Sequence, residues 1–251
     1  MGEARDLRWA EVEVERIGAW LAGKVKDAGA SGVVVGLSGG VDSAVVAAIA
    51  SRALPGRVWA YILPCHSAEA DARDARLVAR HLGLEVRTVE LDAAFDALLP
   101  ALEAAGGPAR PLARANVKPR LRMIALNFMA AQKNALVAGT GNASELYVGY
   151  FTKWGDGGVD LLPIGHLVKG EVRLLGRALG LPEAIVERTP SAGLWEGQSD
   201  EAEMGFTYAE LDAYIRSGAS AVAPEVAARI AEMHRRSEHK RRMPPTPADE
   251  A

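Results

Sequence analysis

Phosphate-binding chemistry is indicated by one short segment, Gly36-Leu37-Ser38-Gly39-Gly40-Val41-Asp42-Ser43. Glycine lets a backbone approach an anion closely, and the free N–H groups at a helix start favour negative charge. Ser38 and Ser43 add hydroxyl donors. The segment lacks the Lys-Ser or Lys-Thr pair of a Walker loop and the glycine spacing of a dinucleotide fingerprint. It therefore predicts a polyphosphate site of a different kind.

Asp42 indicates that the polyphosphate site also binds a cation, because a carboxylate repels a nearby polyphosphate unless a cation lies between them. We therefore expect a magnesium ion between Asp42 and phosphate oxygens. A second carboxylate for the same ion is Glu145, which ends the segment Gly139-Thr140-Gly141-Asn142-Ala143-Ser144-Glu145. Each acid also suits a helix start, Asp42 in the first turn and Glu145 in a capping box with Asn142. For Glu145 both roles can hold at once.

A basic segment, Asn116-Val117-Lys118-Pro119-Arg120-Leu121-Arg122-Met123, is predicted at the entrance of a helix. Pro119 suits a first helical turn. Arg120 and Arg122 lie two residues apart, so they point to different faces and at most one of them serves a given phosphate. The alternative interpretation is a solvated basic helix start.

The most distinctive segment is rich in glycine and aromatic residues: Gly149-Tyr150-Phe151-Thr152-Lys153-Trp154-Gly155-Asp156-Gly157-Gly158-Val159-Asp160. Aromatic faces stack on flat bases, and glycines permit unusual backbone angles. A bound dinucleotide would explain this composition. The alternative is a surface loop whose aromatic rings fold back into the core.

The elements that must position these segments alternate between strand and helix. Apolar β-branched runs predict buried strands at 33–37, 58–63, 85–91 and 135–138. Helical periodicity predicts helices at 7–25, 42–52, 69–82, 93–104, 121–134, 169–179, 208–215 and 225–233. This order is typical of an α/β fold with a parallel sheet, helices on both faces and C-terminal helical decoration. We expect one domain over residues 1–243 and a disordered tail at 244–251.

Composition excludes several classes of protein. Of 251 residues, 49% are hydrophobic, which argues against disorder. With 29 basic and 32 acidic residues the net charge is -3, so no global field favours nucleic acid or an anionic membrane. No apolar stretch approaches the length of a membrane helix. A single cysteine, Cys65, excludes an internal disulfide and a CxxC site, and the cytoplasm is the default compartment.

The string Ser38-Gly39-Gly40-Val41-Asp42-Ser43 resembles the pyrophosphate loop of the N-type ATP pyrophosphatases, which cut ATP between its α and β phosphates. From Val33 to about Pro245, the ordered segments more narrowly resemble the ammonia-dependent NAD synthetase family. The resemblance implies a Rossmann-like sheet of the adenine nucleotide alpha hydrolase-like kind. It implies ATP-dependent amidation of deamido-NAD by ammonia through an adenylated intermediate, giving NAD, AMP and pyrophosphate. It also implies a homodimer with dinucleotide sites at the subunit interface.

The resemblance assigns roles to residues of this sequence. The ATP contacts it implies are Gly36, Leu37, Ser38, Gly39, Gly40, Val41, Asp42, Ser43, Thr140, Lys169 and Ser191. Magnesium ligands are Asp42 and Glu145, and Asp156 is expected near the reacting carboxylate and the ammonia. Contacts to deamido-NAD are Arg120, Lys153, Asp160, His239 and Lys240. Many family members have threonine where this chain has Ser191, but the hydroxyl is retained.

Three alternatives stay open at this point. A tRNA-modifying member of the same superfamily would want paired cysteines or a basic surface, which this chain lacks. A non-catalytic nucleotide-binding module, similar to the electron-transfer flavoproteins, would not need the Asp42–Glu145 pair. A separate glutaminase would be an alternative ammonia source. We also expect residues 189–203 to form a lid over ATP, Cys65 to be a small apolar residue, and His166 to be structural or near the site.

Overall fold

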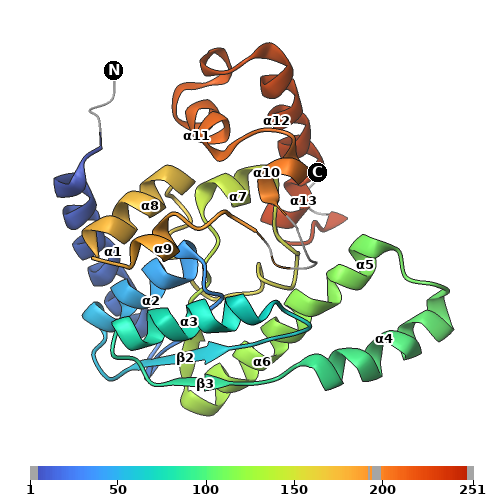
Figure 1. Ribbon diagram of the computed structural model, residues 1–251, viewed down its shortest axis with the longest axis horizontal. Helices are drawn as coiled ribbons and strands as arrows, with labels where there is room; N and C mark the ends of the chain where they lie inside the picture. Colours follow the sequence, from blue (N-terminus) through green and yellow to red (C-terminus); the bar gives the residue numbers. More distant parts are fainter. Residues whose placement is uncertain (1–4, 192, 194–198, 248–251) are drawn as a thin grey trace.

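The computed structural model describes residues 5–191, 193 and 199–247. The expected lid at 189–203 and the expected tail at 244–251 lie partly outside these ranges. Within them, a parallel sheet is covered by helices, and a group of C-terminal helices stands beside its carboxyl edge (Figure 1). None of the described helices combines the length and apolar character that a bilayer span requires.

The sheet of the described chain has four parallel strands in the order β3-β2-β1-β4. They are β1 (Gly32–Gly36), β2 (Val58–Ile62), β3 (Val86–Thr88) and β4 (Ala135–Val137). Successive residues of β1 enter different clusters: Val33 and Val35 lie in one core cluster and Val34 in the other. Both faces of β1 are therefore buried, which explains its unbroken apolar run.

Helices cover both faces, as the sequence predicts. The larger cluster holds α1 (Leu7–Asp27), α2 (Val41–Ala53), α3 (Glu69–His81), α8 (Lys169–Ala178) and α9 (Glu183–Val186). The other face holds α4 (Asp92–Gly106) and α6 (Val117–Lys133), with α5 (Pro111–Ala115) between them in the chain. α4 and α5 project from the body of the molecule (Figure 1).

The C-terminal helices have a core of their own. Val148, Met204, Phe206, Leu211 and Ile230 are buried together there. They come from α7 (Ala143–Val148), α10 (Asp200–Met204), the turn after it, α11 (Tyr208–Ser217) and α12 (Pro224–Arg236). A 3₁₀ turn (Ala219–Ala221) joins α11 to α12, and α13 (Glu238–Arg241) follows.

The structure differs from the predicted elements in a few places. β3 pairs over three residues, fewer than the predicted 85–91. The apolar pattern indicates a strand but not where its pairing with β2 ends. An isolated bridge between Leu161 and Ala138 lies outside the predicted strands. α6 begins at Val117 rather than at 121, since Pro119 falls in its first turn, where no N–H is needed. α7 is not among the predicted helices, because its six residues are too few to show a helical period in the sequence.

The strand order explains where a ligand binds. From β1 the chain crosses to β2 and β3 on one side, and it returns to β4 on the other. The loops that leave β1 and β4 therefore separate and open a crevice at the carboxyl ends of these two strands. The phosphate loop follows β1 and the Gly139-to-Glu145 segment follows β4, so both candidate segments border this crevice.

Cys65 lies in the core between β2 and α4, with no exposed surface. Burial raises the pKa of its thiol. We expect iodoacetamide to modify the native protein at least about a hundredfold more slowly than urea-unfolded protein. Intact mass spectrometry measures this directly, because the chain has one cysteine. Equal rates in the two states would show that Cys65 is accessible.

Candidate active site

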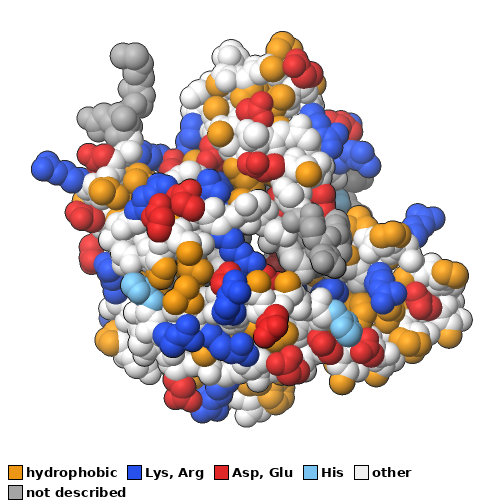
Figure 2. All heavy atoms as spheres, in the orientation of Figure 1, with side chains coloured by type: hydrophobic (Ala, Val, Ile, Leu, Met, Phe, Trp, Pro, Cys, Tyr) orange, Lys and Arg blue, Asp and Glu red, His pale blue; other side chains and the backbone are white. Residues whose placement is uncertain are grey.

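A cavity of about 550 Å³ opens at the carboxyl ends of β1 and β4. Figure 2 shows a hollow between the sheet and the C-terminal helices, with side chains of both charge signs around it. Twelve of the predicted site residues line the cavity: Gly36, Leu37, Ser38, Gly40, Val41, Asp42, Thr140, Glu145, Asp156, Lys169, Ser191 and Lys240.

The phosphate loop turns sharply at Gly39, whose φ of +83° is rarely adopted by residues with a side chain. A Cβ atom at this position would lie 2.7 Å from the Asp71 carbonyl oxygen and 2.9 Å from Arg188 Nη1. α2 begins just after Gly40, and no side chain caps it. The N–H groups of its first turn therefore remain available to an anion.

The two serines of the loop contact each other. Ser43 Oγ donates to the Gly40 carbonyl at 3.0 Å and lies 3.1 Å from Ser38 Oγ. Ser43 is buried, so it shapes the loop, whereas Ser38 lines the cavity.

Three helix starts bring three charged side chains together. Lys169 Nζ lies 2.5 Å from Asp42 Oδ2 and 3.7 Å from Glu145 Oε1. Asp42 belongs to the first turn of α2, Glu145 to that of α7, and Lys169 is the first residue of α8. The Lys169 side chain is 4% exposed, so this ion pair is shielded from solvent.

Asn142 connects the two carboxylates. Its Oδ1 accepts the Glu145 N–H at 3.0 Å, and Glu145 Oε2 accepts the Asn142 N–H at 3.1 Å. The predicted capping box is thus confirmed. Asn142 Nδ2 also donates to Asp42 Oδ1 at 2.9 Å, so the same cap fixes the carboxylate of the phosphate loop.

The charges within this group compete. Burial and the negative charge of Asp42 raise the pKa of Glu145 to about 8, against the opposing effect of Lys169. Burial lowers the pKa of Lys169, but the charges of Asp42 and Glu145 outweigh it, and the net pKa lies above the ordinary value. At neutral pH the group therefore holds one ammonium, one carboxylate and one mostly protonated acid.

The donor set fits magnesium. The side chains of Asp42 and Glu145 both lie within 3.7 Å of the Lys169 ammonium, so their oxygens are close enough together to face one ion. Among the described residues, no group of three or more His, Cys, Asp or Glu side chains is placed to hold a metal. The residues that could hold Mg²⁺ are therefore Asp42 and Glu145, and phosphate and water oxygens would have to supply its other ligands.

Asp156 faces the cavity from the glycine-rich loop. Its Oδ1 accepts the Thr152 N–H at 2.9 Å. Its surface opens to the cavity, but protein surrounds it closely, and burial raises its pKa. Lys240 Nζ fixes the loop beside it by donating to the Gly149 and Phe151 carbonyls, each at 2.7 Å. Tyr150 and Phe151 line the cavity, and Tyr150 also packs against the core of the C-terminal helices, whereas Trp154 is exposed and fits neither interpretation.

Four predicted dinucleotide contacts do not line the cavity. Three of them form a chain: Arg120 Nη2 donates to the Lys153 carbonyl at 3.2 Å, and Lys153 Nζ donates to the His239 carbonyl at 2.5 Å. Asp160 is the fourth, and its Oδ2 accepts the Val137 N–H of β4 at 2.7 Å. Ser43 and Gly39, from the phosphate loop, also lie outside the lining.

Two arginines outside the predicted contacts lie in the cavity wall: Arg122, which the sequence weighed against Arg120, and Arg188, which it did not single out. Arg122 Nε donates to the Leu63 carbonyl at 3.0 Å, and its place follows from the two-residue spacing that turns Arg120 elsewhere. Arg188 forms ion pairs with Asp71 and Asp74 and donates to the Gly39 carbonyl at 3.3 Å. No local pattern indicates Arg188, because its partners lie more than a hundred residues earlier.

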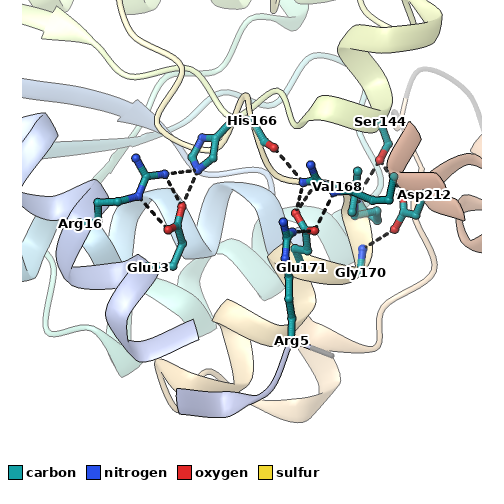
Figure 3. A network of polar contacts seen from close by, with 11 residues as sticks. Arg5, Glu13, Arg16, Ser144, His166, Val168, Gly170, Glu171 and Asp212 are labelled. Carbon is teal, nitrogen blue, oxygen red and sulfur yellow. Dashed lines mark hydrogen bonds and ion pairs between the residues drawn. The ribbon is translucent and has the colours of Figure 1, made fainter. Parts of the chain in front are cut away.

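His166 is structural. Its Nε2 lies 2.6 Å from Glu13 Oε1 and 2.9 Å from Arg16 Nη2, at the junction with α1 (Figure 3). It does not line the cavity.

A glycine-rich phosphate loop at the switch point of a parallel sheet, with an ammonium and two acids beside it, defines a nucleotide-binding α/β protein built for chemistry at a polyphosphate. The sequence profile described as NAD synthase matches residues 13–244. The chain belongs to the NAD synthase family. The predicted family and fold class are thereby confirmed.

Similar proteins extend over nearly the whole chain. It is 52% identical to the NH(3)-dependent NAD(+) synthetase of Carboxydothermus hydrogenoformans, over 96% of this chain and 98% of that protein. The structure of an NMN synthetase from Francisella tularensis matches with a TM-score of 0.89 and 39% identity, over 95% of this chain and 98% of that one. The NH3-dependent NAD synthetase of Campylobacter jejuni, solved with nitrate, gives a TM-score of 0.80 at 30% identity, over 97% and 99%.

Gly39→Ala tests the shape of the phosphate loop. The left-handed backbone and the collision with Asp71 should together lower the free energy of unfolding by about 2–4 kcal/mol, and the melting temperature accordingly. Gly40→Ala is the matched control, because its Cβ would meet only Ser38 Oγ at 3.4 Å and its φ is -89°. Equal melting temperatures for the two variants would contradict the proposed constraint at Gly39.

Proposed function

We propose that this protein makes NAD from deamido-NAD, ATP and ammonia and releases AMP and pyrophosphate. The observation that carries this proposal is the Asp42–Lys169–Glu145 group beside the phosphate loop, in a chain of the NAD synthase family. A cytoplasmic location would suit these substrates.

The chemistry begins with a poor electrophile, because a carboxylate carbon has no leaving group. In the first step a carboxylate oxygen of deamido-NAD attacks the α phosphorus of ATP, the bond to the β-phosphate oxygen breaks, and pyrophosphate leaves. In the second step ammonia attacks the activated carbonyl carbon, loses a proton, and AMP leaves. Positioning two anionic substrates against each other contributes much of the acceleration.

The placement of the side chains supports a role for each of them. The phosphate loop, Thr140 and Ser191 bind ATP, and the Lys169 ammonium neutralises charge on the departing pyrophosphate. When bound, magnesium held by Asp42 and Glu145 supplies further positive charge to the triphosphate. Asp156 holds the ammonium ion and accepts its proton, since it faces the cavity and its pKa is raised.

The dinucleotide extends from the cavity to the surface beside it. Lys240 lines the cavity from α13, and its neighbour His239 ends the chain of bonds that runs from Arg120 of α6 through Lys153. Arg120 shares a face of α6 with Ile124 and Phe128, because the three residues are spaced by four. Ile124 and Phe128 are 58% and 57% exposed, and Leu98 and Leu102 on α4 are exposed as well. A second copy of the chain covering this apolar face would form a homodimer and border the dinucleotide site.

A second candidate substrate comes from one relative. The Francisella tularensis protein is named an NMN synthetase, which indicates the amidation of a mononucleotide by a chain of similar structure. The same cavity chemistry serves either substrate, because both carry the nicotinate carboxylate.

A single set of assays tests the function. NAD formation is measured with deamido-NAD, ATP, magnesium and ammonium, and then with glutamine as the nitrogen donor. With nicotinate mononucleotide as the acceptor, the product measured is nicotinamide mononucleotide. We expect turnover with deamido-NAD and ammonium, and its loss with EDTA. A higher kcat/KM for the mononucleotide than for deamido-NAD would show that the mononucleotide is the preferred substrate. Absence of pyrophosphate release with either acceptor would refute it.

Asp156→Asn separates the two steps. The amide still accepts the Thr152 N–H but does not accept a proton, so we expect kcat/KM for ammonium to fall about a hundredfold. Single-turnover pyrophosphate release without ammonium should stay within about twofold of wild type, since that step does not use Asp156. An unchanged ammonium dependence would remove Asp156 from this role.

Phe128→Asp tests the homodimer. A carboxylate in the centre of the apolar face should convert a dimer into a monomer of 26.5 kDa, as measured by light scattering. The KM for deamido-NAD should rise while ATP binding is retained. Val12→Asp on α1 is the matched control, because Val12 is exposed but lies on a different helix. A wild-type protein that is already monomeric would contradict this assembly.

A further inference from the structure

α8 begins without an N-cap side chain, although Glu171 of its first turn accepts the Val168 N–H at 3.0 Å. Its first residue is the site lysine, Lys169, and the preceding Val168 has no polar side chain. The free N–H groups of Lys169 and Gly170 are instead accepted by the Asp212 carboxylate of α11, at 3.3 Å and 2.7 Å. A carboxylate at this end of a helix also complements the helix dipole.

The same carboxylate contacts the helix that carries Glu145. Ser144 Oγ donates to Asp212 Oδ1 at 2.6 Å and accepts the Lys169 N–H at 3.0 Å. Figure 3 shows Ser144 and Gly170 converging on Asp212. Ser144 directly precedes Glu145, so Asp212 joins the starts of α7 and α8, from which two members of the charged group extend.

Asp212 belongs to a stripe of α11 with a spacing of four residues, formed by Tyr208, Asp212 and Arg216. The Tyr208 ring lies over the other end of the lysine, with Lys169 Nζ 5.0 Å from its centroid. Arg216 Nε donates to Glu171 Oε1 at 2.8 Å. The stripe thus contacts the first three residues of α8.

We propose that α11 positions Lys169 and that Asp212 is the positioning residue that holds its ammonium between Asp42 and Glu145. This inference rests on the proposed function, in which Lys169 acts on the departing pyrophosphate. Asp212 does not line the cavity, so it acts only through the backbone of α8 and through Ser144. A shift of about 1 Å in a catalytic group is enough to slow a reaction about a hundredfold.

A purely structural role for Asp212 has a different signature. If Asp212 only joined α11 to the sheet, its loss would lower the melting temperature and leave turnover per folded molecule unchanged. If it positions Lys169, its loss lowers kcat for pyrophosphate release, while the KM values change little because Lys169 acts mainly on the leaving group.

The decisive variant is Asp212→Asn, which keeps the shape but replaces an accepting oxygen by a donating NH₂ group. We expect kcat for pyrophosphate release to fall by at least about tenfold, with the KM values for ATP and deamido-NAD within about threefold of wild type. Ser144→Ala removes the bond from α7 to Asp212 together with one acceptor of the Lys169 N–H, and it should lower kcat by at least about threefold. Glu210→Gln is the matched control, because it weakens the capping box of α11 without touching α8.

The outcomes separate the two proposals. Wild-type protein that releases no pyrophosphate refutes the proposed function and this inference together. An active wild type with kcat within twofold in Asp212→Asn, or with the same loss in Glu210→Gln, refutes the inference alone. If Asp212→Asn does not fold, Ser144→Ala decides: an unchanged kcat overturns the positioning role, and a threefold loss with unchanged KM supports it.

Discussion

The placement of two acids around one buried ammonium is the interaction on which the rest of this structure depends. Lys169 lies within 3.7 Å of both acids, but burial and the charge of Asp42 still raise the pKa of Glu145 to about 8. Groups of this kind separate or neutralise unless the surrounding backbone holds them. Here three helix starts hold them, and each start has a specific partner that fixes it.

Some of the partners that fix the three helix starts are close in the sequence, and others are distant. Asn142 caps α7 and reaches across to Asp42, so one amide sets the distance between two loops. The phosphate loop keeps its turn because Gly39 is packed against α3 and Arg188. The start of α8 depends on α11, more than forty residues later in the chain. The C-terminal helices are therefore part of the site, although only a few of their side chains reach the cavity.

The predictable parts of the fold and site are those whose physics is local. The buried strands, the phosphate loop after β1 and the capping box of Asn142 and Glu145 follow from patterns of a few residues. The order of the motifs also indicated the family, which the profile match confirmed. Three contacts of the site could not be predicted from the sequence, because they depend on how distant segments pack. They are the contact of Arg188 with Gly39, the bond from Asn142 to Asp42, and the contact of Asp212 with α8. The roles assigned to single residues all stay predictions, and the side chains of Arg120, Lys153, Asp160 and His239 also lie outside the cavity lining.

The pairing of β1 with β4 has a consequence for synthesis on the ribosome. Gly32 pairs with Ala135, so the centre of the sheet is completed only after about a hundred further residues have emerged. The phosphate loop therefore emerges long before Glu145, Lys169 and the helix α11 that contacts the start of α8. Until then, the Asp42 carboxylate at the start of α2 has no cation from α8 beside it, and the emerging amino-terminal part is poorly suited to capture a nucleotide.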